Sequence, residues 1–437
     1  MEWFAAGGLL IGLVIVMMVM GVPVALTFMA TNLIGTLVFV GGIHGLTQVV
    51  DNSTALITTF QLVPVPLFIL MGSLFFYSGL AHRVFDALDK LFGRLPGRLC
   101  FLTVAGGATF STMTGSSMAN TAMLGSLMVP EMQRRGYNWR MSLGPVLGTG
   151  GLAMIIPPSN LAVLLASIAA IDVARLLVSG VIPGFLLALL YAGLILLQVL
   201  INPGSAPSYD IARPSWRERV AAVCINILPM TIVVFMVIGF IVLGIATPSE
   251  AAAFGVLGVL VLAAAFRLLT WTVILRSFEA TVMVGAMVFF IIISSSVFSQ
   301  LIAYSGASSG LLNWVIAFEL STVVMLLCMF AVLLLLGMFM DPVSMILISV
   351  PIFMPLVGVM QVDPVLFGLF VLLVLEMSQT TPPFGLLLYV MMGVAPKGTT
   401  LFQVASAAFP FLICDAILLA LLMLFPAIAL YLPGLMK

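Results

Sequence analysis

The sequence has little charge and few of the residues that carry catalytic chemistry. Asp, Glu, Lys and Arg make up 7% of the 437 residues, and the formal net charge is zero. Soluble proteins are about one quarter charged on average, so a soluble domain is excluded, and without a basic excess no nucleic acid is expected as a partner. His44 and His82 are isolated, and neither a P-loop nor a GxGxxG motif occurs. An ATP-driven pump or a membrane-embedded enzyme therefore has no support, and we expect no cofactor.

Cysteine is equally scarce. The four cysteines lie in or at the ends of apolar runs and form no CxxC pair: Cys100, Cys224, Cys328 and Cys414. Isolated cysteines in apolar surroundings behave as small hydrophobic residues. We therefore interpret them as packing residues.

Hydrophobic residues are what the sequence has in abundance. They make up 63% of the chain, and the mean hydropathy is +1.32. The apolar runs are long and occur throughout, which excludes a signal peptide on a soluble body. In hydrocarbon, a helix satisfies its own backbone hydrogen bonds. The composition therefore predicts an all-α polytopic membrane protein.

Proline positions indicate an internal duplication. Pro23 and Pro248, Pro130 and Pro355, and the pairs at 157–158 and 382–383 are all 225 residues apart. The tripeptide YSG at 77–79 returns at 304–306. A fixed period in a sequence is the signature of a structural repeat. We expect a first repeat at 1–201, a cytoplasmic linker at 202–219 and a second repeat at 220–437.

The two repeats show the same order of segments. The first has apolar runs at about 4–20, 23–42 and 55–79, an amphipathic arm helix at 82–96, and a run at 99–134 interrupted by TMTGSSMAN. A span broken at Pro157 and Pro158 and a span at about 174–201 follow. The second has runs near 221–245, 249–267 and 280–303, a short apolar segment, a run at 320–357 interrupted by MDPVS, a span broken at 382–383 and a last span near 402–431.

Charge decides whether 99–134 and 320–357 cross the membrane. If both are re-entrant hairpins, each repeat has five crossings, and both termini lie outside, on the periplasmic face. The cytoplasmic side then carries 13 basic residues and the outside only Arg175 and Lys437. The 13 are Arg83, Lys90, Arg94, Arg98, Arg134, Arg135, Arg140, Arg213, Arg217, Arg219, Arg267, Arg276 and Lys397. This bias follows the positive-inside rule, so we predict two inverted repeats, each with five transmembrane helices and one re-entrant hairpin.

Inverted repeats with broken helices are typical of secondary transporters, which bind substrate and ions near the bilayer midplane. Four polar breaks are expected to meet there: 112–120, 149–160, 338–344 and 378–385. The double prolines lack N–H groups, which would free the carbonyls of Ala153 and Met154 and those of Ser378 and Gln379. Free carbonyls and hydroxyls suit a hard cation, and helix N-termini suit an anion. None of the four breaks contains Lys or Arg.

The first hairpin tip has two interpretations. Gly115, Ser116, Ser117 and Asn120 offer hydroxyls, an amide and exposed backbone for an ion or substrate. Small residues also let membrane helices pack closely, and we favour binding because the tip recurs in the repeat. Thr121 and Ser126 are interpreted as packing residues.

Three acidic residues lie in apolar surroundings. Asp341 binds a cation or caps the helix that begins at Pro342. Glu376, one turn before the second break, pairs within the core or faces another subunit. Glu250, after Pro248, is favoured as a first-turn glutamate stabilised by the helix dipole, with a partner contact as the alternative.

Several stretches resemble the large membrane subunit of TRAP (tripartite ATP-independent periplasmic) transporters. They are GSSMANTAMLG, IPPSN, TPSEAAAFG, GMFMDPVSMILISVPIFMPL with DPVLFG, and TTPPFGLLLYV, and the resemblance covers essentially the whole chain. It implies an elevator-type carrier, similar to the ion transporter superfamily, in the bacterial cytoplasmic (inner) membrane. Such a carrier imports an organic anion, a carboxylate or sulfonate, and sodium is its coupling ion. The resemblance also implies a separate small four-helix membrane subunit and a periplasmic substrate-binding protein.

The same resemblance implies two sodium sites, one between each hairpin tip and the break of its own repeat. The implied sodium ligands are Gly115, Ser116, Ser117, Gly150, Pro157, Met340, Asp341, Thr380 and Thr381. The residues implied for the substrate are Ser116, Ser117, Asn120, Ser159, Asn160, Gln379 and Thr381. At the second break SQTTPPFGLLL departs from the common family form, which has Gly-Leu/Ile-Thr-Pro-Pro and a later Asn-Leu pair. Because of Gln379, the sequence names no particular substrate.

Two other functions are compatible with the same hydropathy. One is a stand-alone sodium–dicarboxylate symporter of the same architecture, which would need no binding protein. The other is an ion channel or structural membrane scaffold. Saturable substrate uptake, measured with and without a binding protein, distinguishes the three.

Overall fold

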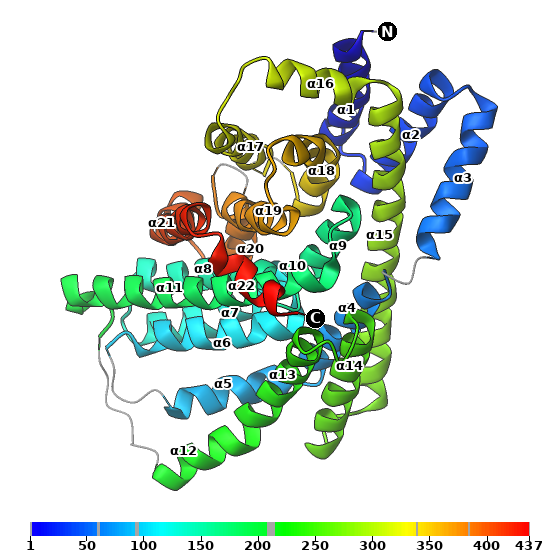
Figure 1. The fold of residues 1–437 in the computed structure, drawn as a ribbon. Helices are drawn as coiled ribbons and strands as arrows, with labels where there is room; N and C mark the ends of the chain where they lie inside the picture. Colours follow the sequence, from blue (N-terminus) through cyan, green and yellow to red (C-terminus); the bar gives the residue numbers. More distant parts are fainter. Residues whose placement is uncertain are drawn as a thin grey trace.

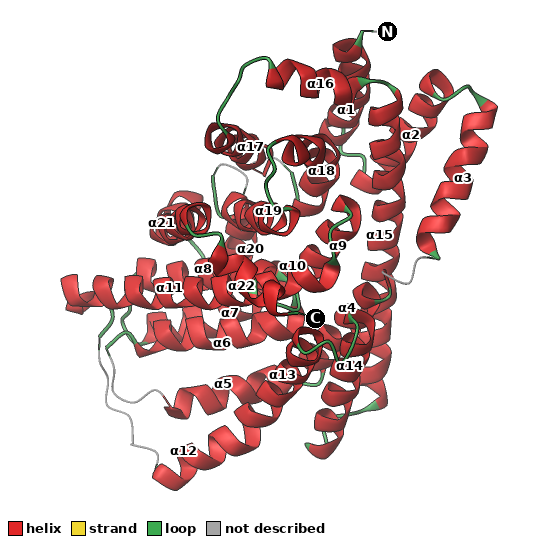
Figure 2. Ribbon diagram, viewed as in Figure 1, coloured by secondary structure: helices red, strands yellow, loops and turns green. Residues whose placement is uncertain are grey.

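The computed structural model describes residues 2–58, 62–91, 96–207, 215–337, 340–382 and 385–436. The secondary structure in these ranges is helical, with no strand (Figures 1 and 2). The arm helix expected to end at residue 96, the linker expected at 202–219 and the double proline at 382–383 are described in part, because 92–95, 208–214 and 383–384 lie outside these ranges.

The chain folds into helices joined mostly by short connections (Figure 1). The first half contains α1 (Trp3–Val19), α2 (Val24–Phe39), α3 (Ile43–Ile57), α4 (Pro64–Tyr77), α5 (Leu80–Leu91), α6 (Arg98–Thr114), α7 (Ser117–Arg134), α8 (Trp139–Ile155), α9 (Asn160–Ala169), α10 (Val173–Ser179), α11 (Val181–Ile201) and the 3₁₀ turn η2 (Pro203–Ser205). The second half contains α12 (Trp216–Ala222), the π-helical turn η3 (Val223–Ile227), α13 (Leu228–Val242), α14 (Pro248–Ala265), α15 (Trp271–Tyr304), α16 (Ala307–Ile316), α17 (Thr322–Gly337), α18 (Pro342–Val359), α19 (Pro364–Gln379), α20 (Leu386–Val394), α21 (Leu401–Leu424) and α22 (Ala427–Leu435).

Helices of the two halves recur at the spacing of the prolines. α7 begins at Ser117 and α18 at Pro342, and α8 begins at Trp139 and α19 at Pro364, so each pair is 225 residues apart. α6 and α17 correspond in the same way, as do α9 and α20. Each half therefore has a two-helix hairpin, then a helix that stops at a proline break, then a shorter helix beyond it.

The two helices that precede the breaks form the centre of the molecule. Every residue of α8 from Met141 to Ile155 is buried, and so is every residue of α19 from Val365 to Gln379. α8 packs against α6, α7 and α21, and α19 packs against α17 and α8. A second, smaller apolar cluster joins α1, α2, α15 and α18 through the T-shaped rings of Phe28 and Phe298.

Hydropathy and length support a multi-pass membrane protein. Within the described ranges, six helices are long and apolar enough to cross a membrane, or up to eight if each of two bent pairs is one span. α18, expected as one arm of a hairpin, meets this test, whereas α1, α2, α17 and α19 are shorter apolar helices. The predicted number of crossings, five per repeat, stays a prediction.

Two segments differ from the expected spans. The run at 55–79 is divided between α3 and α4. α3 was not expected, because its polar residues read as a loop; Asn52 on its polar side donates to Gln300 of α15 across 2.7 Å. α15 itself is one helix of 34 residues, about 51 Å long, and exceeds the span expected at 280–303.

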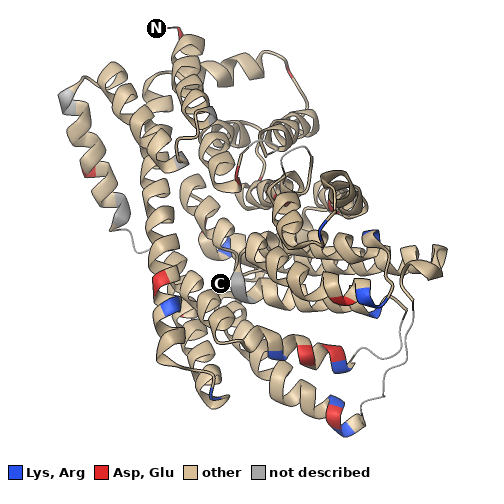
Figure 3. Cartoon of the chain, turned by 180° about the vertical axis from the view of Figure 1, so that it is seen from behind, with Lys and Arg blue, Asp and Glu red and all other residues tan. Residues whose placement is uncertain are grey.

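The amphipathic arm helix is confirmed as α5. Its apolar residues Val84, Phe85 and Leu88 are buried, and the Phe85 ring lies against Gly106 of α6, so this face packs on protein. Figure 3 shows charged residues of α5, α7 and α12 gathered at the ends of these helices on one side of the molecule.

Candidate functional site

The first break lies between α8 and α9. α8 ends at Ile155, the next four residues are not helical, and α9 begins at Asn160. The Pro157–Pro158 peptide bond is cis, and neither proline has an N–H to donate to Ala153 or Met154. The Ser159 hydroxyl accepts from the backbone N–H of Ala162 and caps α9. The break therefore exposes the C-terminal carbonyls of one helix and the N–H groups of the next at one place.

The first hairpin tip lies directly on this break. Gly115 ends α6 with a φ of 56°, in the left-handed region. A Cβ built on Gly115 would lie 2.8 Å from the carbonyl oxygen of Pro158 and 3.2 Å from the backbone N of Asn160. Only a residue without a side chain allows this approach. Ser116 follows as the N-cap of α7, where its hydroxyl accepts from Ala119.

The same tip also reaches the second break. The Ser117 hydroxyl lies 3.4 Å from Oε1 of Gln379, and Nε2 of Gln379 lies 3.7 Å from the sulfur of Met154. Gln379 and Met154 are 225 residues apart, so corresponding positions of the two halves touch. The structure thus brings the first tip and both broken helices together.

Asn120 lies behind the tip. Its side-chain amide donates to Ser111 at 2.7 Å, to the carbonyl of Thr149 at 3.1 Å and to that of Gly107 at 3.4 Å. It is fully buried. In this arrangement Asn120 ties α6, α7 and α8 together.

The end of α19 differs from the expectation of two free carbonyls. The Ser378 carbonyl accepts from the N–H of Thr381 at 3.2 Å, so it is not free. The chain tightens into a turn before the prolines, which supplies a donor in place of the missing one. The hydroxyls of Thr380 and Thr381 both donate to the carbonyl of Met377, at 3.2 and 2.7 Å. With their protons used, these hydroxyls keep lone pairs for a cation or a donor on a ligand.

Gly385 holds the backbone of the second break in a tight arrangement. A Cβ there would lie 2.4 Å from the carbonyl oxygen of Gln379 and 2.8 Å from that of Thr381. Its N–H donates to the carbonyl of Thr381 at 3.1 Å. The chain therefore folds back onto itself just before α20.

The second hairpin meets α19 at Ser378. A Cβ built on Gly337, the last residue of α17, would lie 2.2 Å from the Cβ of Ser378. Asp341 caps α18: one carboxylate oxygen accepts from the N–H groups of Val343 and Ser344, and the other accepts from the Ser344 hydroxyl. The capping interpretation of Asp341 is confirmed, while its contact with an ion stays a prediction. Met340 is half-buried beside it, and 338–339 of the tip lie outside the described residues.

Three buried oxygens near the first break have no hydrogen-bond partner within the described part of the chain. They are Oγ1 of Thr121, Oδ1 of Asn120 and Oδ1 of Asn160. Thr121 Oγ1 lies against the α-carbon of Gly150, and the Asn160 amide group lies beside Gly115. Neutral oxygens left without donors are suited to a hard cation. Thr121, interpreted from the sequence as a packing residue, thus joins this set, whereas Pro157 is buried and offers only its carbonyl.

A polar cluster outside the breaks was missed by sequence reasoning. The Tyr191 hydroxyl lies 2.5 Å from Oδ1 of Asp415 and 3.1 Å from Oε1 of Glu376. All three side chains are at most 2% exposed. Glu376 therefore pairs in the core, as one of its two interpretations held. Asp415 could have been found, because an acid in the apolar run FLICDAILLA carries the same signal as Asp341.

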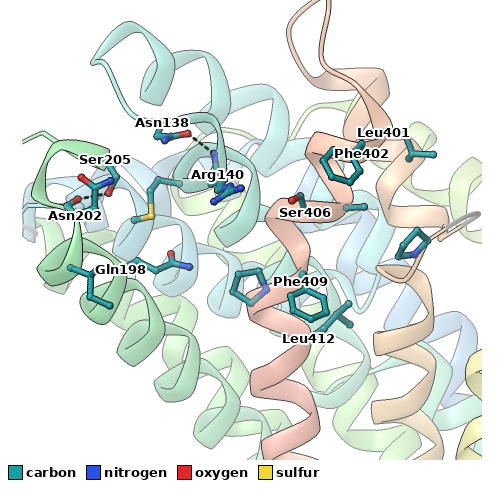
Figure 4. Close-up of a pocket in the computed structure, with 15 residues that line it drawn as sticks. Asn138, Arg140, Gln198, Asn202, Ser205, Leu401, Phe402, Ser406, Phe409 and Leu412 are labelled. Carbon is teal, nitrogen blue, oxygen red and sulfur yellow. Dashed lines mark hydrogen bonds between the residues drawn. The ribbon is translucent and has the colours of Figure 1, made fainter.

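A cavity of about 850 Å³ opens at one end of the seam between α8, α11 and α21. Figure 4 shows Arg140 and Asn138 on one side and Phe402, Ser406 and Phe409 of α21 on another. Pro382 of the second break also lines the cavity. Arg140 is thus a basic residue in a cavity that reaches the second break, although it is not part of any of the four polar segments.

Glu250 has the local role that was favoured for it. It forms a capping box with Thr247 at the start of α14, in which the carboxylate accepts from the backbone N–H of Thr247 at 2.8 Å. Its side chain is exposed. The geometry accounts for Glu250 through the helix end alone.

Broken apolar helices, hairpin tips that meet them and a small polar site at their junction define the class of polytopic secondary-transport permeases. The sequence profile described as "Tripartite ATP-independent periplasmic transporter, DctM component" matches residues 11–428. The chain belongs to this family: it is a large permease subunit of a TRAP transporter and a multi-pass protein of the inner membrane.

Curated relatives and solved structures agree with this assignment. The chain is 30% identical to the C4-dicarboxylate TRAP transporter large permease protein DctM of Rhodobacter capsulatus, over 98% of this chain and 99% of that one. It is 28% identical to the ectoine permease TeaC of Halomonas elongata, over 97% and 98% of the two chains. The fold resembles the YdaH transporter of Alcanivorax borkumensis, with a TM-score of 0.64 and 14% identity over 89% of this chain and 90% of that chain. MtrF of Neisseria gonorrhoeae gives a TM-score of 0.59 at 13% identity, over 86% and 83%.

Proposed function

We propose that this protein is the carrier subunit of a sodium-coupled importer of an organic anion. A periplasmic binding protein delivers the anion, and a small membrane subunit completes the complex. The observation that carries the proposal is the junction of the Gly115–Ser117 tip with both proline breaks. Relatives whose names specify C4-dicarboxylate, ectoine and isethionate support a small organic solute with a carboxylate or sulfonate group.

The moving part consists of the hairpins and broken helices, and the other spans form the scaffold. α8 and α19 support this division, because they are buried along their length and carry the breaks. The recurrence of helices at 225 residues and the contact of Gln379 with Met154 support two repeats related by a pseudo-twofold axis. In an inverted arrangement this axis lies in the membrane plane, so the same site is presented to each face in turn. We infer an elevator motion and periplasmic termini from this symmetry and from the basic-residue count.

Sodium is the coupling ion that the donor set fits. At the first break, the oxygens of Asn160 and Thr121 lie beside Gly115 and Gly150 without donors. At the second, the Thr380 and Thr381 hydroxyls have already donated their protons to the helix. Sodium at these positions holds the tips against the breaks, and the anion site between them is then complete. Coupling follows because each ligand favours the state in which the other binds.

The anion meets helix N-termini and bound cations, because the four breaks contain no basic residue. Ser117, Ser159, Asn160 and Gln379 provide hydroxyls and amides at this junction. Arg140, in the cavity that reaches Pro382, supplies positive charge on the path away from the site. The cavity lies on the cytoplasmic side in the proposed topology.

Reconstitution tests the transport function. Vesicles that contain both membrane subunits are expected to accumulate a labelled organic acid when the loaded binding protein and an inward sodium gradient are present. Removal of either is expected to reduce uptake to the level of empty vesicles. The acid is chosen by thermal-shift screening of the cognate binding protein. Uptake without any sodium gradient would contradict the coupling.

A stand-alone sodium–dicarboxylate symporter is the second candidate. The observation in its favour is that both breaks and the first tip meet within this one chain. The large subunit reconstituted without its partners distinguishes the two. Saturable uptake of a dicarboxylate by the chain alone would favour the symporter, and no uptake would favour the tripartite carrier.

Asp341 and Ser116 test the sodium sites. Asp341→Asn keeps an oxygen that can cap α18 but removes the charge, so we expect a wild-type melting temperature and a sodium dependence shifted to about tenfold higher concentration. Asp341→Ala removes both and is expected to lower the melting temperature as well. Ser116→Ala is expected to lower sodium-dependent uptake. Wild-type sodium dependence in both Asp341→Asn and Ser116→Ala would reject the assignment.

A further inference from the structure

The buried cluster of Tyr191, Glu376 and Asp415 has a proton count that its geometry decides. A tyrosine hydroxyl has one proton and can donate it to one acceptor. Here it lies within hydrogen-bond distance of two carboxyl groups, 2.5 Å from Asp415 and 3.1 Å from Glu376. The shorter contact is the donation from Tyr191 to the Asp415 carboxylate. The longer one is a hydrogen bond only if Glu376 carries a proton and donates it to the tyrosine oxygen.

The second oxygen of Glu376 points to the same protonation state. Oε2 is buried and has no hydrogen-bond partner in the described part of the structure, and the Glu376 side chain is 2% exposed. A charged carboxylate oxygen in that position costs several kcal/mol. A protonated carboxyl group has no net charge and leaves only a neutral oxygen without a donor.

No base compensates two negative charges at this place. Among the described residues, the recorded salt bridges join Arg98 to Asp89 and Arg135 to Glu131. Arg140 lies in the cavity, and the thiol of Cys414 is directed to the carbonyl of Leu190. The other ionisable groups on helices packed around α8, α11, α19 and α21 make no recorded contact with the cluster: Cys100, Arg134, Arg175, Cys328, Tyr389 and Tyr431.

The spacing fits a proton better than a metal ion. A hard cation holds oxygens at about 2.3–2.6 Å from its own centre, which forces the oxygens apart. The tyrosine oxygen lies at hydrogen-bond distance from both carboxyl groups, so protons fill the space between them. Gly151 of α8 makes room for Glu376, because a Cβ there would lie 2.3 Å from Oε1.

The cluster is connected to the cavity along the seam of α8, α11 and α21. Gln198 and Leu412 line the cavity; they lie seven residues after Tyr191 and three residues before Asp415, on the same helix faces. The ring of Phe411 lies between cavity and cluster. It packs on Gly144 and Gly148 of α8 and forms a T-shaped contact with the Tyr191 ring at 5.2 Å. A small shift of Phe411 would expose Asp415 to water in the cavity.

We propose that Tyr191, Glu376 and Asp415 form a proton-binding site, and that the proton they hold is exchanged with the cavity during each transport cycle. When Phe411 moves, the Glu376 O–H bond breaks and its proton passes to the tyrosine oxygen. The tyrosine proton passes to Asp415, and Asp415 gives a proton to water. One proton leaves, and the cluster changes from one negative charge to two. Return of a proton reverses each step. The inference rests on the proposed transport function, because α8 and α19 also carry the breaks.

The test uses the reconstituted complex with a pH dye in the vesicle lumen. Substrate uptake by the wild type at a fixed sodium gradient is expected to change the luminal pH, and its rate to vary with pH by up to about tenfold per unit, the limit for one proton. Glu376→Gln has the shape and charge of the protonated form. It is expected to move no protons, to lose its pH dependence and to retain exchange of labelled substrate. Glu279→Gln, at an exposed carboxylate of α15, is the control and is expected to behave as the wild type.

A second readout needs no transport. The infrared spectrum of the purified wild-type complex is expected to show the C=O stretch of a buried protonated carboxyl group, and Glu376→Gln to lose it. Sodium-driven uptake without any luminal pH change in the wild type would overturn the proton site and leave the proposed function intact. Proton movement that persists in both Glu376→Gln and Asp415→Asn would also overturn it. Absence of any uptake together with a retained infrared band would instead reject the proposed function.

Discussion

Gly385→Ala is expected to reduce sodium-driven uptake by at least about tenfold. The added methyl group would lie 2.4 Å from the carbonyl oxygen of Gln379 and 2.8 Å from that of Thr381. Both obstacles are backbone atoms, which cannot rotate away as a side chain does. Overpacking of this kind costs about 1–3 kcal/mol, and here the displaced segment is the one that presents Thr380 and Thr381. Uptake into vesicles with the binding protein present measures the effect.

Gly393→Ala is the matched control. Gly393 lies on the same helix, α20, and a Cβ there would meet no atom within 4 Å. In a helix, alanine is favoured over glycine by roughly 0.5–1 kcal/mol, so uptake and melting temperature are expected to equal or exceed those of the wild type. Equal uptake by Gly385→Ala and Gly393→Ala would show that the turn before α20 plays no part in the site.

Local signals in the sequence predicted the arrangement of the breaks well. Proline has no N–H wherever it stands, so Pro157 ends α8 in the structure as it does in the sequence. The small residues Gly115 and Ser116 form the hairpin turn for the same local reason. The 225-residue spacing is a property of the chain and needs no tertiary contact to be seen. It correctly matched the hairpin and broken-helix segments of the two halves.

Contacts between distant segments could not be predicted in this way. Tyr191 stands in an apolar run and carries no local sign of its partners, which lie 185 and 224 residues away. The Ser378 carbonyl was expected to be free, but a tighter turn satisfies it. α3 read as a loop, because its polar side faces Gln300 on a helix of the other half. In each case the missing information was the identity of a partner from another helix.

Gly115→Ala is expected to raise the sodium concentration for half-maximal uptake by about tenfold or more. Two costs combine at this position. The φ of 56° costs a residue with a Cβ about 1–2 kcal/mol. In addition, the methyl group would lie 2.8 Å from the carbonyl oxygen of Pro158. The tip then moves away from the break, and the oxygens proposed to hold the first sodium ion no longer converge.

Gly79→Ala separates the two costs. Gly79, between α4 and α5, has a φ of 77°, but a Cβ there would meet no atom within 4 Å. It therefore carries the backbone strain without the close approach. Gly79→Ala is expected to lower the melting temperature slightly and to leave the sodium dependence unchanged. If both variants lose the same amount of stability and neither changes the sodium dependence, the contact between Gly115 and Pro158 is a packing contact only. If Gly115→Ala alone changes it, the distance between the tip and the carbonyl of Pro158 controls sodium binding.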